Sequence, residues 1–483
     1  MSLPLTFVRS CTYSGNIILG NSELTTKCMS IEVINPAKNE KINSFQEHTL
    51  EEVNYKIESV DMAFNLWKKT SFGQRAENMV SLAHALRKNK QELTGLMAME
   101  MGKTIREGLQ EIEKCASTCE YYAEHAEIFL KPEMVNADSK KCSVVYQPLG
   151  VVLAIMPWNF PFWQVFRFLA PALMSGNAVV LKHSSNVPGC AMAIEELLKN
   201  AGFPENLFHA LLIPSSQVKK VIEHKLIRAV TLTGSTQAGK DVAAKAGQEL
   251  KKAVLELGGS DAYIILEDAD LEKAVEICVN SRLINTGQSC IAAKRFIVVE
   301  SVMPEFEKRF VELMKQKTIG DPFDEKVDLG PLARIDLRDL VHEQVKESIN
   351  KGAKCLLGGV IPENKGAFYP PTVLTGVKKG MPAFDEEIFG PVAALISAGD
   401  EQEAIDLAND SIYGLGGAIF TKDIEKGERL ALQMESGSCF VNTLVRSDPR
   451  LPFGGVKGSG YGRELSYYGI KEFVNIKSIC IAD

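Results

Sequence analysis

The chain has 483 residues, too many for one compact hydrophobic core, so we expect two or three domains. Its 54 basic and 61 acidic residues leave a formal net charge of −7. That balance gives no electrostatic attraction to phosphate backbones or anionic lipid, so nucleic acid is not an expected partner.

Eleven cysteines are spread along the chain without close spacings, which fits free thiols in a reducing cytoplasm better than disulfides. No CxxC pair or Cys/His cluster indicates a metal site, and we expect none. Residues 142–166 carry no charge and are long enough to cross a bilayer. Pro148, Pro157 and Pro161 favour a strand, a turn and the start of a helix instead. We therefore expect a cytoplasmic protein with no membrane partner.

The first 28 residues are polar, lack an acidic group before Glu23 and include Arg9 and Lys27, a composition that weakly resembles a transit peptide. Met29 is an alternative start, which would leave residues 1–28 untranslated. We expect residues 1–28 to be a disordered leader, with both alternatives open.

Apolar residues between Glu51 and Trp67 follow the three-and-four spacing of one helical face, and further helices are expected through Gly102. The pattern then turns to β-forming residues, with strand candidates at 143–146 and, near the end of the chain, at 473–476. Two such isolated pieces cannot stabilise themselves, so we expect them to pair with each other or with another subunit.

From residue 150 to residue 258, short apolar runs alternate with helical patterns, which is typical of βαβ units around a parallel sheet. The runs are 151–156, 178–182, 207–213, 229–233 and 253–257. In such sheets ligands bind beyond the carboxyl ends of the strands, so the residues just after each run matter most. The alternation resumes with a run at 296–299, a helix from Pro304 and a run at 392–396, which predicts a second α/β domain.

The stretch 285–291 is suited to presenting one sulfur atom to a carbonyl carbon. Gly287 permits a left-handed turn just before Cys290, and no charged residue follows at once to shield the thiol. Only about 3% of unperturbed thiols are ionised at neutral pH, so a base or a local dipole must assist. A buried structural cysteine is the alternative.

The loop 233–241 follows a predicted strand and opens a helix, where free backbone N–H groups favour a phosphate. It nearly matches a P-loop, but Asp241 follows the lysine where that motif needs Ser or Thr, which argues against nucleotide hydrolysis. The usual three-glycine dinucleotide fingerprint is not present either. A simple Ser/Thr helix cap is the alternative.

Two further residues complete a candidate reaction centre. Glu256 ends an apolar run, where desolvation would raise its pKa toward a value useful for a base, although a salt-bridged structural role is the alternative. Asn159 lies on a proline-stiffened turn and offers an amide donor for an oxyanion, although it could simply form the turn. With Cys290, they predict attack on a carbonyl followed by hydride removal.

These residues lie in motifs through which the chain resembles the aldehyde dehydrogenases from about Ile31 to its C-terminus. The motifs, in the family's order, are PWNFP at 157–161, TGST at 233–236, LELGG at 255–259, GQSC at 287–290, EEIFGP at 386–391 and PFGGVKGSGYGRE at 452–464.

The resemblance implies an α/β fold with a Rossmann-type parallel-sheet cofactor domain, an α/β catalytic domain and a small β oligomerisation element. The implied boundaries are 29–127 with 147–256 for the cofactor domain, 257–458 for the catalytic domain, and 128–146 with 459–483 for the oligomerisation element and C-terminal tail. It implies an enzyme that acts as a homodimer or homotetramer on a small-molecule aldehyde.

The resemblance also implies the site roles. Cys290 is the expected nucleophile, Glu256 the base for the deacylating water, and Asn159 with the Cys290 backbone N–H the oxyanion hole. A nicotinamide cofactor is expected. Its expected contacts are Trp158, Asn159, Lys182, Ser184, Ser185, Gly234, Ser235, Leu257, Glu387 and Phe389. NADP is favoured over NAD, because Ser185 stands where many NAD-using relatives carry a glutamate that would repel the 2′-phosphate.

Within the family the chain most resembles succinate-semialdehyde dehydrogenases. Arg167 matches an arginine that holds the substrate's distal carboxylate, and Ser447 matches a second polar contact. Ile284 departs from the pattern, because many of these enzymes carry another arginine there; Arg282 is near in sequence but does not occupy that position. A broader semialdehyde activity, for example on glutarate semialdehyde, a general aldehyde dehydrogenase and a non-catalytic cofactor-binding protein are the alternatives.

Overall fold

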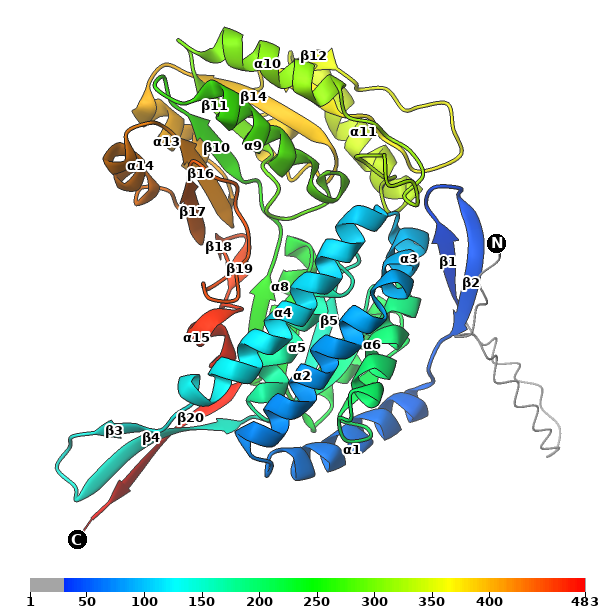
Figure 1. Ribbon diagram of the computed structural model, residues 1–483, viewed down its shortest axis with the longest axis vertical. Coiled ribbons are helices and arrows are strands. Elements are labelled where there is room, and N and C mark those ends of the chain that lie inside the picture. Colours follow the sequence, from blue (N-terminus) through cyan, green and yellow to red (C-terminus); the bar gives the residue numbers. More distant parts are fainter. Residues whose placement is uncertain (1–29, 483) are drawn as a thin grey trace.

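The computed structural model describes residues 30–482, and our expectation for residues 1–28 lies outside them. The chain forms two large sheets with helices packed against them and a smaller three-stranded sheet that projects from the body (Figure 1). The N-terminal part is an antiparallel hairpin of β1 (Ser30–Asn35) and β2 (Glu40–Gln46). Among the described residues, no helix is both long and apolar enough to span a bilayer.

The first large sheet has the strand order β19-β9-β8-β5-β6-β7. Its strands are β5 (Val151–Met156), β6 (Ala178–His183), β7 (Phe208–Ala210), β8 (Ile227–Thr233), β9 (Lys252–Glu256) and β19 (Gly460–Tyr461). All neighbours are parallel except β19, which joins β9 antiparallel. The five apolar runs predicted as parallel strands are therefore confirmed, the third in shortened form. Near-continuous apolar sequence is expected of strands buried on both faces.

Helices surround this sheet. They are α1 (Leu50–Trp67), α2 (Phe72–Lys88), α3 (Lys90–Met101), α4 (Ile105–Phe129), α5 (Trp163–Met174), α6 (Pro188–Asn200), η1 (Ser215–Gln217), α7 (Val218–Glu223) and α8 (Thr236–Gln248). Helix α4 packs on α2, α3 and α5, and α5 in turn packs on β5 and β6. The sheet and these helices share one buried apolar core.

The second large sheet has the order β12-β13-β14-β11-β10-β16-β17 and is parallel except at β12. Its strands are β10 (Ala262–Ile265), β11 (Arg295–Val299), β12 (Lys354–Leu357), β13 (Thr372–Thr375), β14 (Val392–Ala398), β16 (Gly416–Phe420) and β17 (Ser438–Val441). The predicted strands at 296–299 and 392–396 are confirmed. Strand β10 was not predicted, because its apolar run is only four residues long and starts soon after a Gly-Gly pair.

Separate apolar clusters fill the two faces of this second sheet. Its helices are α9 (Leu271–Leu283), η2 (Ile284–Gly287), α10 (Met303–Lys315), α11 (Ile335–Asn350), α12 (Pro382–Asp385), α13 (Glu401–Asn409) and α14 (Ile424–Ala431). A short ribbon of β15 (Tyr413–Gly414) and β18 (Val456–Lys457) and the helix α15 (Ser466–Ile470) lead the chain back to the first sheet.

The projecting sheet contains β3 (Glu133–Val135), β4 (Lys141–Pro148) and β20 (Val474–Ile481). Strand β4 pairs antiparallel with both of the others, so the expectation that the two isolated strand candidates pair with each other is confirmed.

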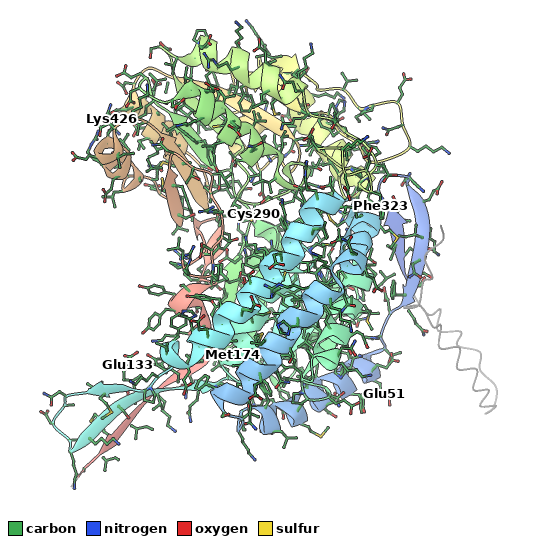
Figure 2. The ribbon with its side chains drawn as sticks, viewed as in Figure 1. Glu51, Glu133, Met174, Cys290, Phe323 and Lys426 are labelled. Atoms are coloured by element: carbon green, nitrogen blue, oxygen red, sulfur yellow. A yellow bond between two sulfur atoms is a disulfide. The ribbon has the colours of Figure 1, made fainter. Side chains whose placement is uncertain are left out.

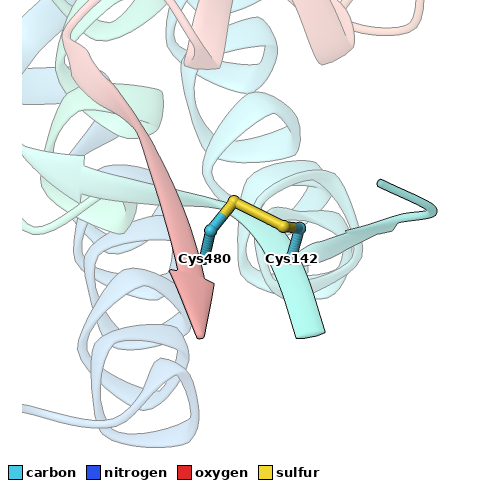
Figure 3. The surroundings of a disulfide bond; sticks show 2 residues. All are labelled: Cys142 and Cys480. Carbon is cyan, nitrogen blue, oxygen red and sulfur yellow. A yellow bond between two sulfur atoms is a disulfide. The ribbon is translucent and has the colours of Figure 1, made fainter. Parts of the chain in front are cut away.

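The same pairing corrects the expectation of free thiols at two positions. Cys142 and Cys480 stand directly opposite each other on β4 and β20 and form a disulfide (Figure 3). They are 338 residues apart in sequence, so only the register of the strands reveals the pair. Seven other described cysteines are free.

Candidate active site

The nucleophile loop, defined here as residues 284–290, lies where the two large sheets meet, and Cys290 is half-buried at that junction (Figure 2). Asn285, Thr286 and Gly287 are left-handed in succession, with φ of 53°, 56° and 76°. The turn predicted at Gly287 is confirmed, and a Cβ there would lie 2.2 Å from the carbonyl oxygen of Gly390. Non-glycine residues in this conformation are strained, so the surroundings must hold the loop.

Contacts with three other segments hold the nucleophile loop. Glu107 Oε1 on α4 accepts a 2.6 Å hydrogen bond from the Asn285 backbone N–H. Asn285 Nδ2 donates to the carbonyl oxygen of Asn159 at 2.7 Å. Arg282 Nη2 donates to the carbonyl oxygen of Gly287 at 2.7 Å, so Arg282 serves this loop and does not replace the arginine missing at position 284.

The Cys290 thiol lies among positive charges. Lys294 Nζ donates to the carbonyl oxygens of Ser289 and Cys290, at 3.0 and 2.7 Å. Burial raises the pKa of the thiol to about 12, and the charges of Arg167 and Lys294 oppose that rise. The protein alone therefore keeps the thiol protonated at neutral pH, and reaction requires a group that takes up its proton.

Glu256, at the end of β9, is a buried carboxyl group of the kind predicted. Burial, with the nearby charge of Glu464, raises its pKa well above the ordinary value, in the direction expected. Neither of its carboxyl oxygens has a hydrogen-bond partner among the described residues. Gly454 keeps space beside it, since a Cβ there would lie 2.7 Å from Glu256 Oε1. A carboxyl group in this setting is suited to exchanging a proton with a water molecule.

Asn159 lies between the first sheet and the nucleophile loop. It is buried, and its Nδ2 donates to the carbonyl oxygen of Gln288 at 3.1 Å. An amide nitrogen carries two hydrogens, so a second donor remains for an oxyanion formed at Cys290. Its role in an oxyanion hole stays a prediction.

The carboxyl edge of the first sheet gathers several predicted cofactor contacts. Thr233 and Glu256 are register partners at the ends of β8 and β9, and the Gly234 N–H donates to the Glu256 carbonyl oxygen at 3.0 Å. Ser235 caps α8, accepting from the Ala238 N–H at 3.3 Å. The loop therefore does open a helix, as predicted, at the edge where parallel sheets bind ligands.

The predicted adenosine contacts lie at the end of β6 and just after it. Lys182 is buried, its pKa is lowered by burial, and its Nζ donates to Ser215 Oγ at 3.4 Å. Among the described residues it has no carboxylate partner at ion-pair distance. Ser184 Oγ donates to Asn186 Oδ1 at 2.7 Å, whereas Ser185 is exposed.

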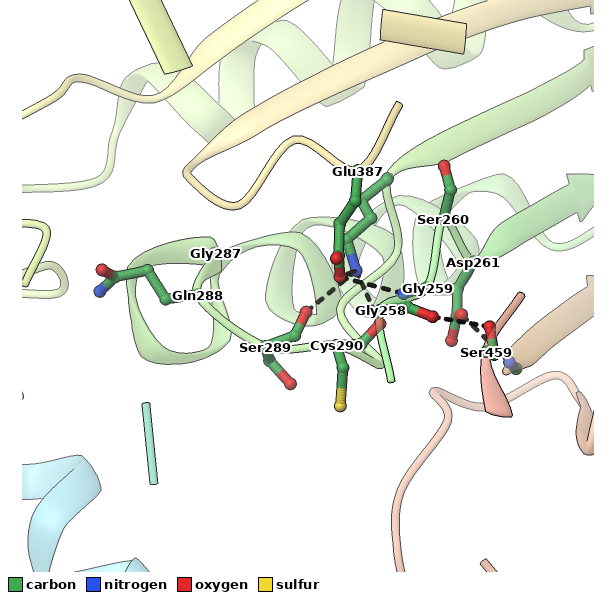
Figure 4. A network of polar contacts seen from close by, with 12 residues as sticks. Gly258, Gly259, Ser260, Asp261, Gly287, Gln288, Ser289, Cys290, Glu387 and Ser459 are labelled. Carbon is green, nitrogen blue, oxygen red and sulfur yellow. Dashed lines mark hydrogen bonds and ion pairs between the residues drawn. The ribbon is translucent and has the colours of Figure 1, made fainter. Parts of the chain in front are cut away.

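The nicotinamide end is formed by both large sheets. Glu387 Oε1 accepts from the Gly259 N–H at 3.0 Å and lies 3.6 Å from Lys294 Nζ (Figure 4). Burial raises the pKa of this carboxyl group. The rings of Trp158 and Phe389 pack edge to face with centroids 5.8 Å apart. The remaining predicted contact, Leu257, is buried against α8, where a Cβ on Gly239 would meet its side chain.

The structure gives Arg167 more partners than the sequence indicated. Its Nε forms a buried ion pair with Glu464, its Nη2 donates to Thr233 Oγ1 at 3.3 Å, and its guanidinium lies 4.4 Å from the centre of the Phe453 ring. The other predicted substrate contact, Ser447, is buried and accepts a hydrogen bond from Lys114 Nζ at 2.6 Å.

The contacts that one face of α4 makes with the site were not predicted from the sequence. Glu107 binds the nucleophile loop, and Glu111 accepts from the backbone N–H groups of Phe162 and Trp163, both at 2.9 Å. Lys114, three residues further on, reaches Ser447. The spacing of four and then three residues is the only sequence signal, and it equally describes a solvated charged face. Glu464 was also missed as a partner of Arg167, although it ends a quoted motif.

Comparison with known proteins agrees with this geometry. Residues 24–479 match the model of the aldehyde dehydrogenase family. A Synechocystis protein named probable succinate-semialdehyde dehydrogenase [NADP(+)] is 46% identical over 94% of this chain and 100% of its own length. The Escherichia coli K12 protein named succinate semialdehyde dehydrogenase [NAD(P)+] Sad is 44% identical over 92% of this chain and 96% of its own.

Solved structures show the same fold. The crystal structure of succinic semialdehyde dehydrogenase from Streptococcus pyogenes in complex with NADP+ superposes with a TM-score of 0.92 at 38% identity, covering 94% of this chain and 100% of that one. A family match over residues 24–479, relatives above 40% identity and a shared fold thus accompany the half-buried Cys290 and the buried Glu256 and Asn159. The chain belongs to the aldehyde dehydrogenase family.

Proposed function

We propose that this protein catalyses the NAD(P)-dependent oxidation of succinate semialdehyde to succinate, with NADP used at least as efficiently as NAD. The observation that supports the chemistry is that the charge of Arg167 acts on both Cys290 and Glu256, while Asn159 donates to the Gln288 carbonyl oxygen in the nucleophile loop. The relatives named as succinate-semialdehyde dehydrogenases support the substrate.

Each step of the proposed reaction uses one of these side chains. The Cys290 thiol loses its proton to water as Sγ bonds to the aldehyde carbon, and the carbonyl oxygen becomes an oxyanion facing Asn159 Nδ2. A bound nicotinamide supplies the acceptor for the hydride, which leaves a thioester on Cys290. Glu256 removes a proton from water, the hydroxide attacks the thioester, and the carboxylate product departs as the thiol is restored.

The residues at the sheet edge fit such a cofactor. Lys182 is a buried cation without a carboxylate partner among the described residues, the state expected of a group that binds hydroxyls or phosphate. The N-terminus of α8, opened by Gly234 and Ser235, offers backbone donors for the pyrophosphate. The exposed hydroxyl of Ser185 places no negative charge against a 2′-phosphate, which supports the use of NADP.

The test is a panel of aldehydes assayed with both cofactors. Succinate semialdehyde should give the highest kcat/KM, above butanal of matched length, and glutarate semialdehyde should rank between them. Equal efficiency with butanal would favour the general aldehyde dehydrogenase. Cofactor binding without turnover of any aldehyde would favour the non-catalytic alternative.

We also propose that the protein is a homodimer or homotetramer that joins through its projecting sheet and acts in the cytoplasm. Apolar side chains stand exposed on that sheet: Met134, Val135, Ile476, Ile479 and Ile481. Exposed apolar groups gathered on one element are typical of an interface. Seven free cysteines among the described residues support a reducing compartment, whereas the Cys142–Cys480 disulfide counts against it. Light scattering on a chain with Ile476→Asp and Ile481→Asp tests the interface, since a smaller particle is expected.

A further inference from the structure

We propose that Lys114 on α4 determines substrate specificity, its ammonium group binding the distal carboxylate of the aldehyde beside Ser447. The inference deepens the proposed function and rests on it. It names the cation that takes the place of the arginine missing at Ile284.

Two contacts from different segments position the ammonium group. Lys114 Nζ donates to Ser447 Oγ at 2.6 Å and lies 4.1 Å from the centre of the Trp163 ring. Trp163 is held in turn, because its backbone N–H donates to Glu111 Oε1, one turn before Lys114 on the same helix. A hydroxyl and an aromatic face restrict the lysine without neutralising it.

Lys114 has no ion-pair partner among the described residues. Among residues 30–482, no carboxylate lies within ion-pair distance of its Nζ, although the side chain is largely covered. Burial lowers its pKa to about 8, with the charge of Arg167 adding to that effect and the charges of Cys115, Glu111 and Asp448 opposing it. A largely covered cation without an ion-pair partner is costly, and an anionic group of the substrate would relieve that cost.

Arg167, the predicted carboxylate contact, already has a charge partner within the protein. Its Nε pairs with Glu464, and its guanidinium also contacts the Phe453 ring and Thr233. Lys114 is therefore the cation that remains available to the distal carboxylate of the substrate. Ser447 offers its hydroxyl to that carboxylate as well.

The position of Arg167 relates Lys114 to the nucleophile. Its charge acts both on the Cys290 thiol and on Lys114, so both lie within electrostatic reach of one guanidinium. In the proposal, the far end of a short aldehyde held at Cys290 lies beside Lys114 and Ser447. The substrates favoured are thus short aldehydes that end in a carboxylate.

The experiment compares Lys114→Met with wild type on succinate semialdehyde and on butanal. Loss of a charge-assisted hydrogen bond should raise the KM for succinate semialdehyde by about tenfold to a hundredfold, with a change below about twofold for butanal. Lys114→Arg should restore most of the difference. Lys131→Met removes the same charge from an exposed position just beyond α4 and should change neither value.

A second readout is inhibition of butanal oxidation by succinate, which Lys114→Met should weaken in parallel. Thermal melting of each variant identifies loss of fold. Equal KM increases for both aldehydes in a folded variant, or no increase in either, would overturn the role of Lys114. A wild type that oxidises butanal but not succinate semialdehyde would instead count against the proposed function.

Discussion

The nucleophile loop and residues 182–185, the predicted adenosine contacts, differ in how firmly the protein holds them. The nucleophile loop is largely buried, is left-handed at three successive residues and is bound by side chains from α4, α9 and the turn after β5. The end of β6 and the segment after it are held less firmly: the contact from Lys182 to Ser215 is 3.4 Å long, Ser184 bonds to its near neighbour Asn186, and Ser185 is exposed.

We infer that the nucleophile loop serves the chemical steps, whereas the segment after β6 serves the choice of cofactor. A strained, buried loop keeps the sulfur in one place, so changes there should affect turnover. An open segment with few contacts of its own accommodates whatever group the cofactor brings, so changes there should alter the choice of cofactor and leave turnover nearly intact.

The largest effect is expected at the nucleophile. Cys290→Ala should lower dehydrogenase activity by about 10⁴-fold or more, because no other group can form the thioester. Cofactor binding, followed by quenching of tryptophan fluorescence, should survive. Cys355→Ala, at an exposed free cysteine, is the matched control. Retained turnover in Cys290→Ala would rule out the mechanism.

The next effect is expected at the base. Glu256→Gln should lower the steady-state rate by about 10²-fold to 10⁴-fold, because deacylation needs a proton acceptor. A rapid burst of reduced cofactor, measured by stopped flow, should remain. Loss of the burst would show that Glu256 also removes the proton from the Cys290 thiol, whose pKa is raised to about 12 by burial.

At the open segment, Ser185→Glu should turn the protein toward NAD. A carboxylate at about 4 Å from the 2′-phosphate costs about 1 to 4 kcal/mol, or about fivefold to several-hundredfold in the NADP to NAD ratio of kcat/KM. The kcat with NAD should stay close to wild type. An unchanged ratio, or a wild type that strongly prefers NAD, would show that Ser185 does not select the cofactor.

The smallest effect is expected from a substitution of Glu107. It tests whether the hydrogen bond from Asn285 to Glu107, which helps to fix the nucleophile loop, is needed for turnover. Glu107→Ala leaves the Asn285 N–H without its acceptor, so we expect a loss of about 1 to 3 kcal/mol in the free energy of unfolding. It should lower kcat more than it changes KM. Glu127→Ala, exposed on the same helix, is the control. If kcat is unchanged, the loop does not depend on this contact.

Local chemistry made much of the protein predictable. The strands β5, β6, β8 and β9 follow from short apolar runs between helical patterns, and the residues at their carboxyl ends follow from how parallel sheets bind ligands. Cys290 and Gly287 were recognisable because a nucleophile on a left-handed turn needs particular residue types at adjacent positions. Glu256 was recognisable because an acid at the end of an apolar run is unusual.

Contacts between distant segments were decided only by the tertiary structure. Glu107 and Lys114 read as a solvated helix face until α4 packs against the loops that they bind. The Cys142–Cys480 pair depends on the register of two strands from opposite ends of the chain. Arg167 was identified, but its pairing with Glu464 was not. Residue types and spacing reveal what a side chain can do, whereas its charge partner depends on which segments the fold brings within a few ångströms.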